Sequence, residues 1–164
     1  MERDLIDRLV ERMYETRVAC PDELRGCSAD EIAALEAKYS IVLPDTYRRF
    51  LEVMGHSAGQ LFAHDRVEAS YEQVLQMTEE QRRWHRDEPE EQPISLPADA
   101  LIVLGRLREQ FSFIRCRGTA DSPIYYYEML ADAAVQYWSP SLVTWLNLWC
   151  DEAASVVGSR KRRQ

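Results

Sequence analysis

The sequence has few of the features that most directly reveal a function. Its 164 residues contain no apolar run near the roughly 18 residues that a membrane-spanning helix needs. The first residues, Met1 to Asp4, include three charged side chains, whereas a secretory signal segment would have an apolar stretch. We therefore expect a soluble, cytoplasmic protein that does not bind membranes. At this length, one domain with a single core is the expected organisation.

Cysteine and histidine are also scarce, with four and three residues respectively. None of the cysteines forms a C-x-x-C pair, and the spacing of the histidines fits neither a zincin helix nor a zinc finger. We therefore predict no disulfide framework, no metal and no cofactor. The residues are Cys20, Cys27, Cys116, Cys150, His56, His64 and His85.

Catalytic motifs are absent as well. The chain has no G-x-S-x-G sequence, no phosphate-binding glycine loop and no dinucleotide fingerprint. His56 and His64 flank a glycine-containing loop where a general base could lie, but no partner nucleophile is identifiable. We predict that the protein is not an enzyme and assign no catalytic residue. An unrecognised hydrolase using His56, His64 or Cys116 is the less favoured alternative.

Charge of one sign predominates, because 28 acidic residues face 20 basic ones and give a formal net charge of −8. Arg160 to Arg163 contribute +4, so residues 1–159 carry −12. An acidic body repels nucleic acid and attracts basic proteins. We expect a basic protein partner and no nucleic acid, and we expect the basic tail, residues 160–164, to be disordered.

Helical patterns fill the N-terminal part of the chain. Residues 4–17 place apolar side chains at helical spacing between charged ones, which is typical of an amphipathic helix. Ser28 and Glu31 have the spacing of a capping box and begin a second helix over 28–39. The two helices need a common core to cover their apolar faces.

The next segment is predicted in less detail. Pro44 begins a third helix, and Gly55 is placed to end it in the left-handed conformation. Gln60 to Val67 could be a short strand. Ser70 begins a fourth helix, and residues 78–86 either continue it or form a second, kinked helix.

The C-terminal half has the shorter period of β-strands, and Ser139 with Pro140 is predicted to cap a last helix. Short strands joined by turns favour an antiparallel meander. The sequence therefore predicts an α+β fold with N-terminal helices, an antiparallel β-meander and a C-terminal helix on the core, in a single domain over 1–159. The predicted strands are 101–104, 111–116 and 124–129.

A short signature lies within the helical part. It reads I-x-x-L-E, then L-P-x-x-Y-x-x-F-L, then a glycine turn, and it resembles the signature of the SUKH superfamily. The resemblance extends over about 28–154, whereas residues 57–93 match nothing recognisable. Apolar residues at helical spacing mostly report burial, so we expect the signature to be structural. The matching residues are Ile32, Leu35, Glu36, Leu43, Pro44, Tyr47, Phe50, Leu51 and Gly55.

The resemblance implies a non-enzymatic α+β domain that binds another protein. Bacterial members are typically immunity proteins that neutralise a secreted polymorphic toxin, often a nuclease, while other members are regulatory scaffolds. Nuclease toxins tend to be basic because they bind phosphates, so an acidic inhibitor complements them. We therefore predict an immunity protein. The alternative is a regulatory scaffold or small-ligand module of the same superfamily.

Two groups of residues are predicted to contact the partner. The first is an acidic run, which could instead be an ordinary solvated loop. The second combines a turn aspartate with two strand tyrosines, a residue type favoured both in strands and at interface hot spots. The tyrosines could therefore be half-buried sheet residues. The residues are Asp87, Glu88, Glu90 and Glu91 in the first group, and Asp121, Tyr125 and Tyr127 in the second.

Overall fold

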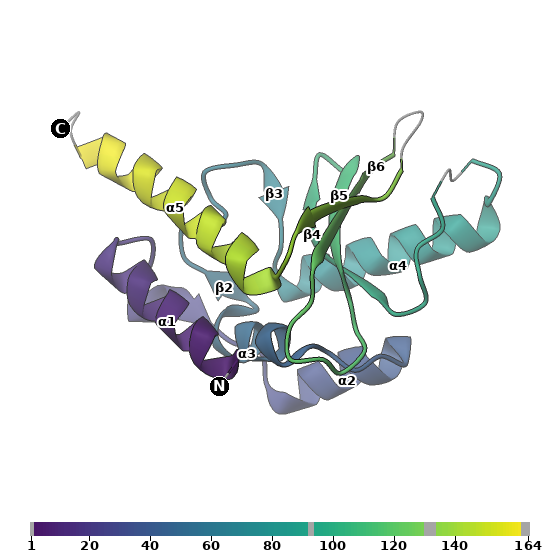
Figure 1. Cartoon of the computed structure of the whole chain (residues 1–164), viewed down its shortest axis with the longest axis horizontal. Coiled ribbons are helices and arrows are strands. Elements are labelled where there is room, and N and C mark those ends of the chain that lie inside the picture. Colours follow the sequence, from purple (N-terminus) through teal and green to yellow (C-terminus); the bar gives the residue numbers. More distant parts are fainter. Residues whose placement is uncertain (1, 92–93, 130–133, 162–164) are drawn as a thin grey trace.

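A computed structural model describes residues 2–91, 94–129 and 134–161 (Figure 1). Among the described residues, three α-helices precede the main sheet, a fourth lies between its first two strands and a fifth follows it, so the predicted α+β fold is confirmed. The elements are α1 Glu2–Glu15, the 3-10 helix η1 Pro21–Glu23, β1 Leu24–Arg25, α2 Ala29–Tyr39, α3 Asp45–Met54, β2 Ser57–Ala58, β3 Val67–Glu68, α4 Tyr71–Asp87, β4 Ala100–Arg106, β5 Gln110–Arg115, β6 Ile124–Glu128, β7 Gln136–Ser139 and α5 Leu142–Lys161. None of the described helices is long and apolar enough to cross a membrane.

The main sheet is antiparallel and has the order β3-β4-β5-β6-β7 within the described residues. The predicted meander corresponds to β4, β5 and β6. Helix α4 covers one face of it, where the Tyr127 hydroxyl donates to Gln81 Oε1 at 2.9 Å and the Ile102 amide donates to Thr78 Oγ1 at 3.2 Å. Alternate residues of the same strands face the opposite side, toward α5.

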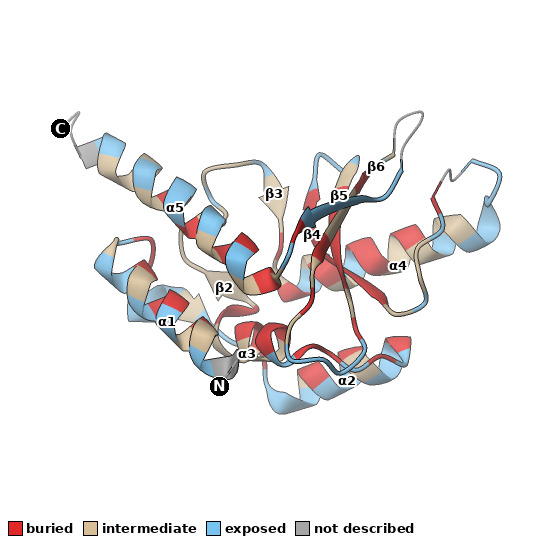
Figure 2. Ribbon diagram, viewed as in Figure 1, coloured by how far each residue is buried: buried red, intermediate tan, exposed pale blue. Residues whose placement is uncertain are grey.

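The N-terminal helices form a layer with α5, and α1 lies beside α5 in Figure 1. Arg12 Nη1 donates to Asn147 Oδ1 of α5 at 2.9 Å, and Arg49 of α3 pairs with Asp7 of α1 at 2.8 Å. Figure 2 shows the buried residues facing inward from these helices and from the central strands. The buried apolar residues in the described part of the chain form one core cluster.

The signature residues lie in and around α2 and α3, and all of them except Glu36 are buried. Glu36 joins the two signature helices, because its Oε1 accepts from the Leu43 backbone N–H at 2.8 Å and pairs with Arg48. The predicted capping box is also present, since the Glu31 amide donates to Ser28 Oγ at 3.2 Å. The buried signature residues are Ile32, Leu35, Leu43, Pro44, Tyr47, Phe50, Leu51 and Gly55.

The prediction for the conformation of Gly55 was wrong. Gly55 has right-handed angles, φ −61° and ψ −35°, which any residue can adopt. Close packing is the reason for glycine, because a Cβ at this position would lie 2.5 Å from Cys27 Sγ and 2.9 Å from the Leu51 carbonyl oxygen. A left-handed residue does end α2, where Ser40 has φ 52°.

Three further local predictions need correction. Residues 59–66 form turns, so the strand predicted over 60–67 is wrong except at Val67. Helix α4 runs to Asp87, so residues 78–86 continue the fourth helix and do not form a second one. Ser139 belongs to β7, which the sequence did not predict, and the cap of α5 is Ser141, whose Oγ accepts from the Thr144 amide at 3.0 Å.

The predicted disordered tail, residues 160–164, was also too long. Helix α5 continues through Lys161, so the first two residues of the basic tail are helical. Gly158, two residues before this tail, is partly buried, and a Cβ at this position would meet no other atom within 4 Å. Residues 162–164 lie outside the described part of the chain.

Candidate functional site

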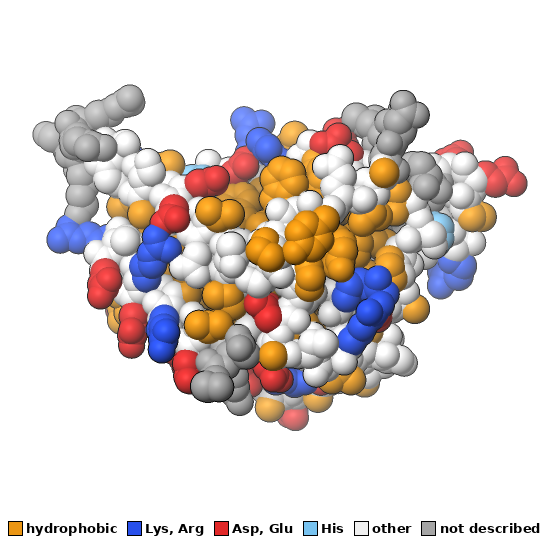
Figure 3. All heavy atoms as spheres, in the orientation of Figure 1, with side chains coloured by type: hydrophobic (Ala, Val, Ile, Leu, Met, Phe, Trp, Pro, Cys, Tyr) orange, Lys and Arg blue, Asp and Glu red, His pale blue; other side chains and the backbone are white. Residues whose placement is uncertain are grey.

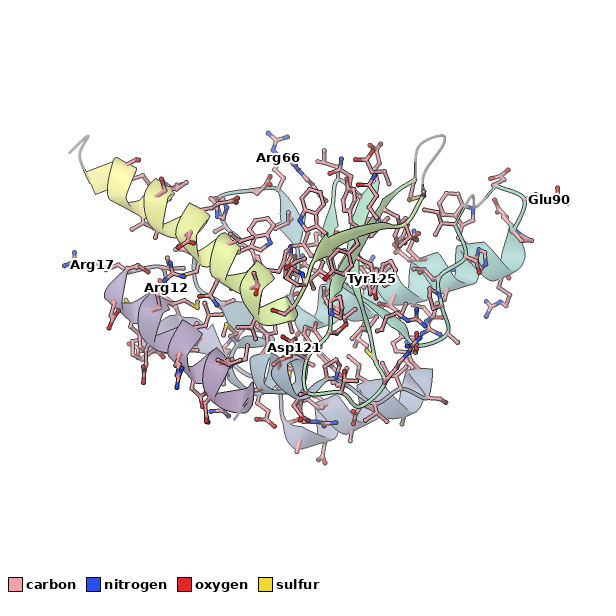
Figure 4. The ribbon with its side chains drawn as sticks, viewed as in Figure 1. Arg12, Arg17, Arg66, Glu90, Asp121 and Tyr125 are labelled. Atoms are coloured by element: carbon pink, nitrogen blue, oxygen red, sulfur yellow. The ribbon has the colours of Figure 1, made fainter. Side chains whose placement is uncertain are left out.

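The predicted acidic run lies at the far end of α4. Asp87 is the last residue of the helix, and Glu88 to Glu91 follow in an exposed turn. A hydrogen bond with Glu88 and the negative charge of Glu88 both raise the pKa of the Glu91 carboxyl. The run is therefore a solvated set of like charges, and Figure 4 shows Glu90 pointing away from the body of the molecule.

The second predicted group lies elsewhere and is largely structural. Asp121 Oδ1 accepts from the Thr46 hydroxyl and from the Ser122 amide, both at 2.8 Å, and so supports the turn before β6. Tyr125 is half-buried and stacks on Phe113 with ring centroids 5.3 Å apart. Tyr127 is only 2% exposed, so the prediction that it contacts a partner was wrong.

The two predicted groups do not form one surface. In Figure 4, Asp121 and Tyr125 lie near the middle of the molecule and Glu90 lies at one extreme. A partner that contacted both groups would have to span the length of α4.

A groove lies between the α5-facing side of the sheet and α5 itself, and we call it the aromatic groove. Its volume is about 430 Å³. Figure 3 shows hydrophobic side chains gathered over the strands beside the start of α5. The lining residues are Asp65, Val67, Leu104, Arg106, Gln110, Ser112, Tyr126, Trp138, Trp145, Leu148, Trp149 and Glu152.

Alternation along the strands supplies the aromatic wall of this groove. Tyr126 points to the side opposite Tyr125 and Tyr127, and its ring lies 5.3 Å from that of Trp138 on β7. Trp138 is 59% exposed, which is unusual for so large an apolar side chain. Helix α5 adds Trp149, whose ring meets that of Phe62 edge-on at 5.4 Å.

The rim of the aromatic groove carries charges of both signs. Asp65 pairs with Arg106 at 3.3 Å, and Glu152 Oε2 lies 3.2 Å from His64 Nε2. The Tyr126 hydroxyl donates to Glu128. Burial, and to a smaller extent this hydrogen bond, raise the pKa of Tyr126 to about 12. Flat aromatic faces with a polar rim are suited to binding a partner.

The residues considered for catalysis are either buried or in contact with carboxylates. Burial raises the pKa of the Cys116 thiol to about 12, so this thiol is protonated at neutral pH and is a poor nucleophile. His64 contacts Glu152 and the ring of Trp149. His56 lies between the carboxylates of Glu31 and Glu72, and these two contacts raise its pKa against the opposing effect of burial.

Sequence reasoning missed the residues that form the groove. The strand pattern did place Tyr126 on its own side of β6, and this was the available signal. It was not enough because the groove needs Trp138, and the strand that carries Trp138 was not predicted. Its pairing with β6, with Tyr125 opposite Tyr137, is a tertiary contact.

The fold and the groove define the class: an α+β domain with a helical signature corner, an antiparallel sheet and a surface suited to binding. The chain belongs to the SMI1 / KNR4 family (SUKH-1), whose model matches residues 26–148. This confirms the resemblance seen in the sequence. The match includes the sheet and the start of α5 but not Trp149 or Glu152 of the groove. No curated protein matches the chain.

Proposed function

We propose that the protein is an immunity protein, a non-enzymatic domain that binds a basic toxin and blocks it. The observation that carries the proposal is the exposed aromatic groove, where Trp138 and Leu148 are 59% and 54% exposed. Tryptophan and tyrosine are the residues most often found as energetic anchors of protein interfaces. The family itself is consistent with a protein-binding role.

Two features of the chain contribute to binding in different ways. The net charge of −8 attracts a basic partner from a distance and raises the rate of encounter. The aromatic groove then supplies the close contacts that hold the partner. Because Asp65 and Arg106 already pair with each other on the rim, the general charge of the molecule makes the larger contribution to attraction.

The experiment begins with immobilised protein, source lysate at low ionic strength and elution by a salt gradient. A basic protein that elutes late is then purified and assayed for nuclease activity with increasing amounts of the chain. We expect inhibition to be complete at one chain per toxin. A captured protein whose activity is unchanged by excess chain contradicts the proposal.

Two matched variants test whether the aromatic groove is the surface that binds the toxin. Trp138→Ala removes an exposed aromatic side chain from the groove, and Tyr14→Ala removes one from α1, where Tyr14 is 37% exposed. We expect Trp138→Ala to weaken inhibition at least tenfold and Tyr14→Ala to leave it unchanged. Equal effects of the two variants would contradict a role for the groove.

A small-ligand module is the second candidate, and the volume of the groove favours it. About 430 Å³ lies within the range of roughly 300–1,000 Å³ that is common for ligand pockets. A thermal-shift screen with nucleotides and sugars tests this candidate. A rise in melting temperature that persists in high salt and disappears in Trp138→Ala would favour it over the immunity proposal.

A further inference from the structure

A separate cluster of side chains lies where the starts of α2 and α4 meet the end of α3. Cys27 precedes the N-cap of α2, Glu31 lies in the first turn of that helix, and His56 follows the end of α3. Cys27 Sγ, a carboxylate oxygen of Glu31 and a ring nitrogen of His56 all lie within 4.8 Å of one another. Glu72, in the first turn of α4, contacts the same histidine.

Both ring nitrogens of His56 face carboxylates. Nδ1 lies 2.6 Å from Glu72 Oε1, and Nε2 lies 3.0 Å from Glu31 Oε1. A neutral imidazole has one N–H and one lone pair. If Nδ1 donates to Glu72, the lone pair of Nε2 points toward the negative Glu31 carboxylate, and a cation between these two groups would satisfy both.

We propose that Cys27, Glu31 and His56 form a zinc site, with Glu72 holding His56 in the tautomer that binds the metal. The ligand set combines sulfur, nitrogen and oxygen, the three donor types that zinc accepts. Three protein ligands leave a fourth tetrahedral position for water. A carboxylate on the second ring nitrogen is the usual support of a metal-bound histidine.

The packing around the cluster fits this role. The absence of a side chain at Gly55 makes room for Cys27 Sγ, which a Cβ there would approach to 2.5 Å. Glu31 is held in place because its Oε2 accepts from the Ser28 amide at 2.8 Å, leaving Oε1 for the metal. The side chains of His56 and Glu31 are 18% and 38% exposed, so an ion can reach the cluster from solvent.

This site could not be predicted from the sequence, because its ligands follow no motif spacing. Cys27 and Glu31 are one helical turn apart, but His56 comes from the end of the next helix. The expectation of no metal rested only on the spacing of the cysteines and of the histidines along the sequence. The zinc site is independent of the proposed immunity role, since it lies on different residues from the aromatic groove.

Cobalt is the probe for the test, because Co²⁺ occupies zinc sites and is coloured. We expect one equivalent of CoCl₂ to give the intense visible bands of tetrahedral cobalt and a near-ultraviolet band from thiolate ligation, and ZnSO₄ to abolish both. Cys27→Ser should lose the thiolate band. Cys20→Ser, which changes an exposed cysteine outside the cluster, should keep it.

A second pair of variants tests the supporting carboxylate. Glu72→Gln should weaken zinc binding by roughly 10–100-fold in a competition titration, as changes in outer ligands do. His64→Ala, which removes a histidine that also faces a glutamate, should leave the affinity unchanged.

The absence of cobalt bands in the wild-type protein, or a thiolate band that survives in Cys27→Ser, would overturn the zinc site. Circular dichroism of each variant verifies that it is folded, and His56→Gln provides a second ligand variant, expected to lose the tetrahedral bands. All these measurements use the isolated chain, so their failure would leave the proposed immunity role unaffected.

Discussion

At the scale of single residues, the clearest constraint is the carboxylate of Glu36. It accepts from the amide of Leu43, which is buried, and it pairs with Arg48. Removing the carboxylate leaves a backbone donor without its partner at the corner between α2 and α3. We expect Glu36→Ala to lower the free energy of unfolding by about 1–3 kcal/mol.

Urea denaturation measures this effect. Glu36→Gln is the matched control, since its amide oxygen can still accept from Leu43 while the charge is lost. It should retain part of the stability that Glu36→Ala loses. If the alanine variant is as stable as the wild type, the carboxylate does not hold the corner.

Asp99 makes the protein sensitive to acid. Burial tends to raise the pKa of its carboxyl, but hydrogen bonds from Arg115, at 3.0 Å, and from Arg117, at 2.6 Å, outweigh burial and lower it. A carboxyl whose pKa is lower in the folded state stabilises the fold fully above its ordinary pKa of about 4. That contribution is lost as the pH falls through the lowered value.

The comparison of wild type with Asp99→Asn tests this dependence. At pH 7 we expect the variant to be less stable by about 1 kcal/mol, because the ion pairs are partly exposed. The difference should shrink as the pH is lowered below 4, where the wild-type carboxyl becomes protonated. A difference that is the same at pH 7 and at pH 3 would contradict the assignment.

At the scale of elements, two glycines have opposite roles. A Cβ at Gly26, between β1 and α2, would lie 1.8 Å from the backbone oxygen of Glu52 in α3. Backbone cannot rotate away as a side chain can, so Gly26→Ala must separate the two segments. We expect it to destabilise the protein by about 1–3 kcal/mol.

Gly158 provides the matched control, because it lies in α5 with no atom near the position of its Cβ. Alanine is a better helix former than glycine by about 0.5–1 kcal/mol, so Gly158→Ala should raise stability. Thermal unfolding of the two variants measures both effects. Shifts of the same sign would contradict this account of the packing.

Individual elements also show how much of the fold and of the aromatic groove could be predicted from the sequence. The caps of α2 and α4 use neighbouring residues, Ser28 with Glu31 and Ser70 with Gln73, so local chemistry fixes them. Strand β7 is four residues long and mostly exposed, so its sequence has no strong pattern. Its place in the sheet comes from pairing with β6, and for that reason the groove could not be predicted.

At the scale of the whole molecule, charge is spread widely while the exposed aromatic anchors are local. A net charge of −8 acts over about 8 Å at physiological ionic strength, and salt screens it. Contacts within the aromatic groove are short-ranged and insensitive to salt. These two contributions should therefore appear in different rate constants of binding to the captured toxin.

We expect the association rate constant to fall at least tenfold between low and high salt, with little change in the dissociation rate constant. Trp138→Ala should instead raise the dissociation rate constant roughly 30-fold, which is equivalent to about 2 kcal/mol for an anchor residue. The salt dependence of the association rate constant should be the same in this variant as in the wild type. Stopped-flow mixing measures both constants, with Tyr14→Ala as the control. If salt instead acts mainly on dissociation, the partner is held by ion pairs, and the acidic residues of the chain, not its aromatic groove, make the close contacts.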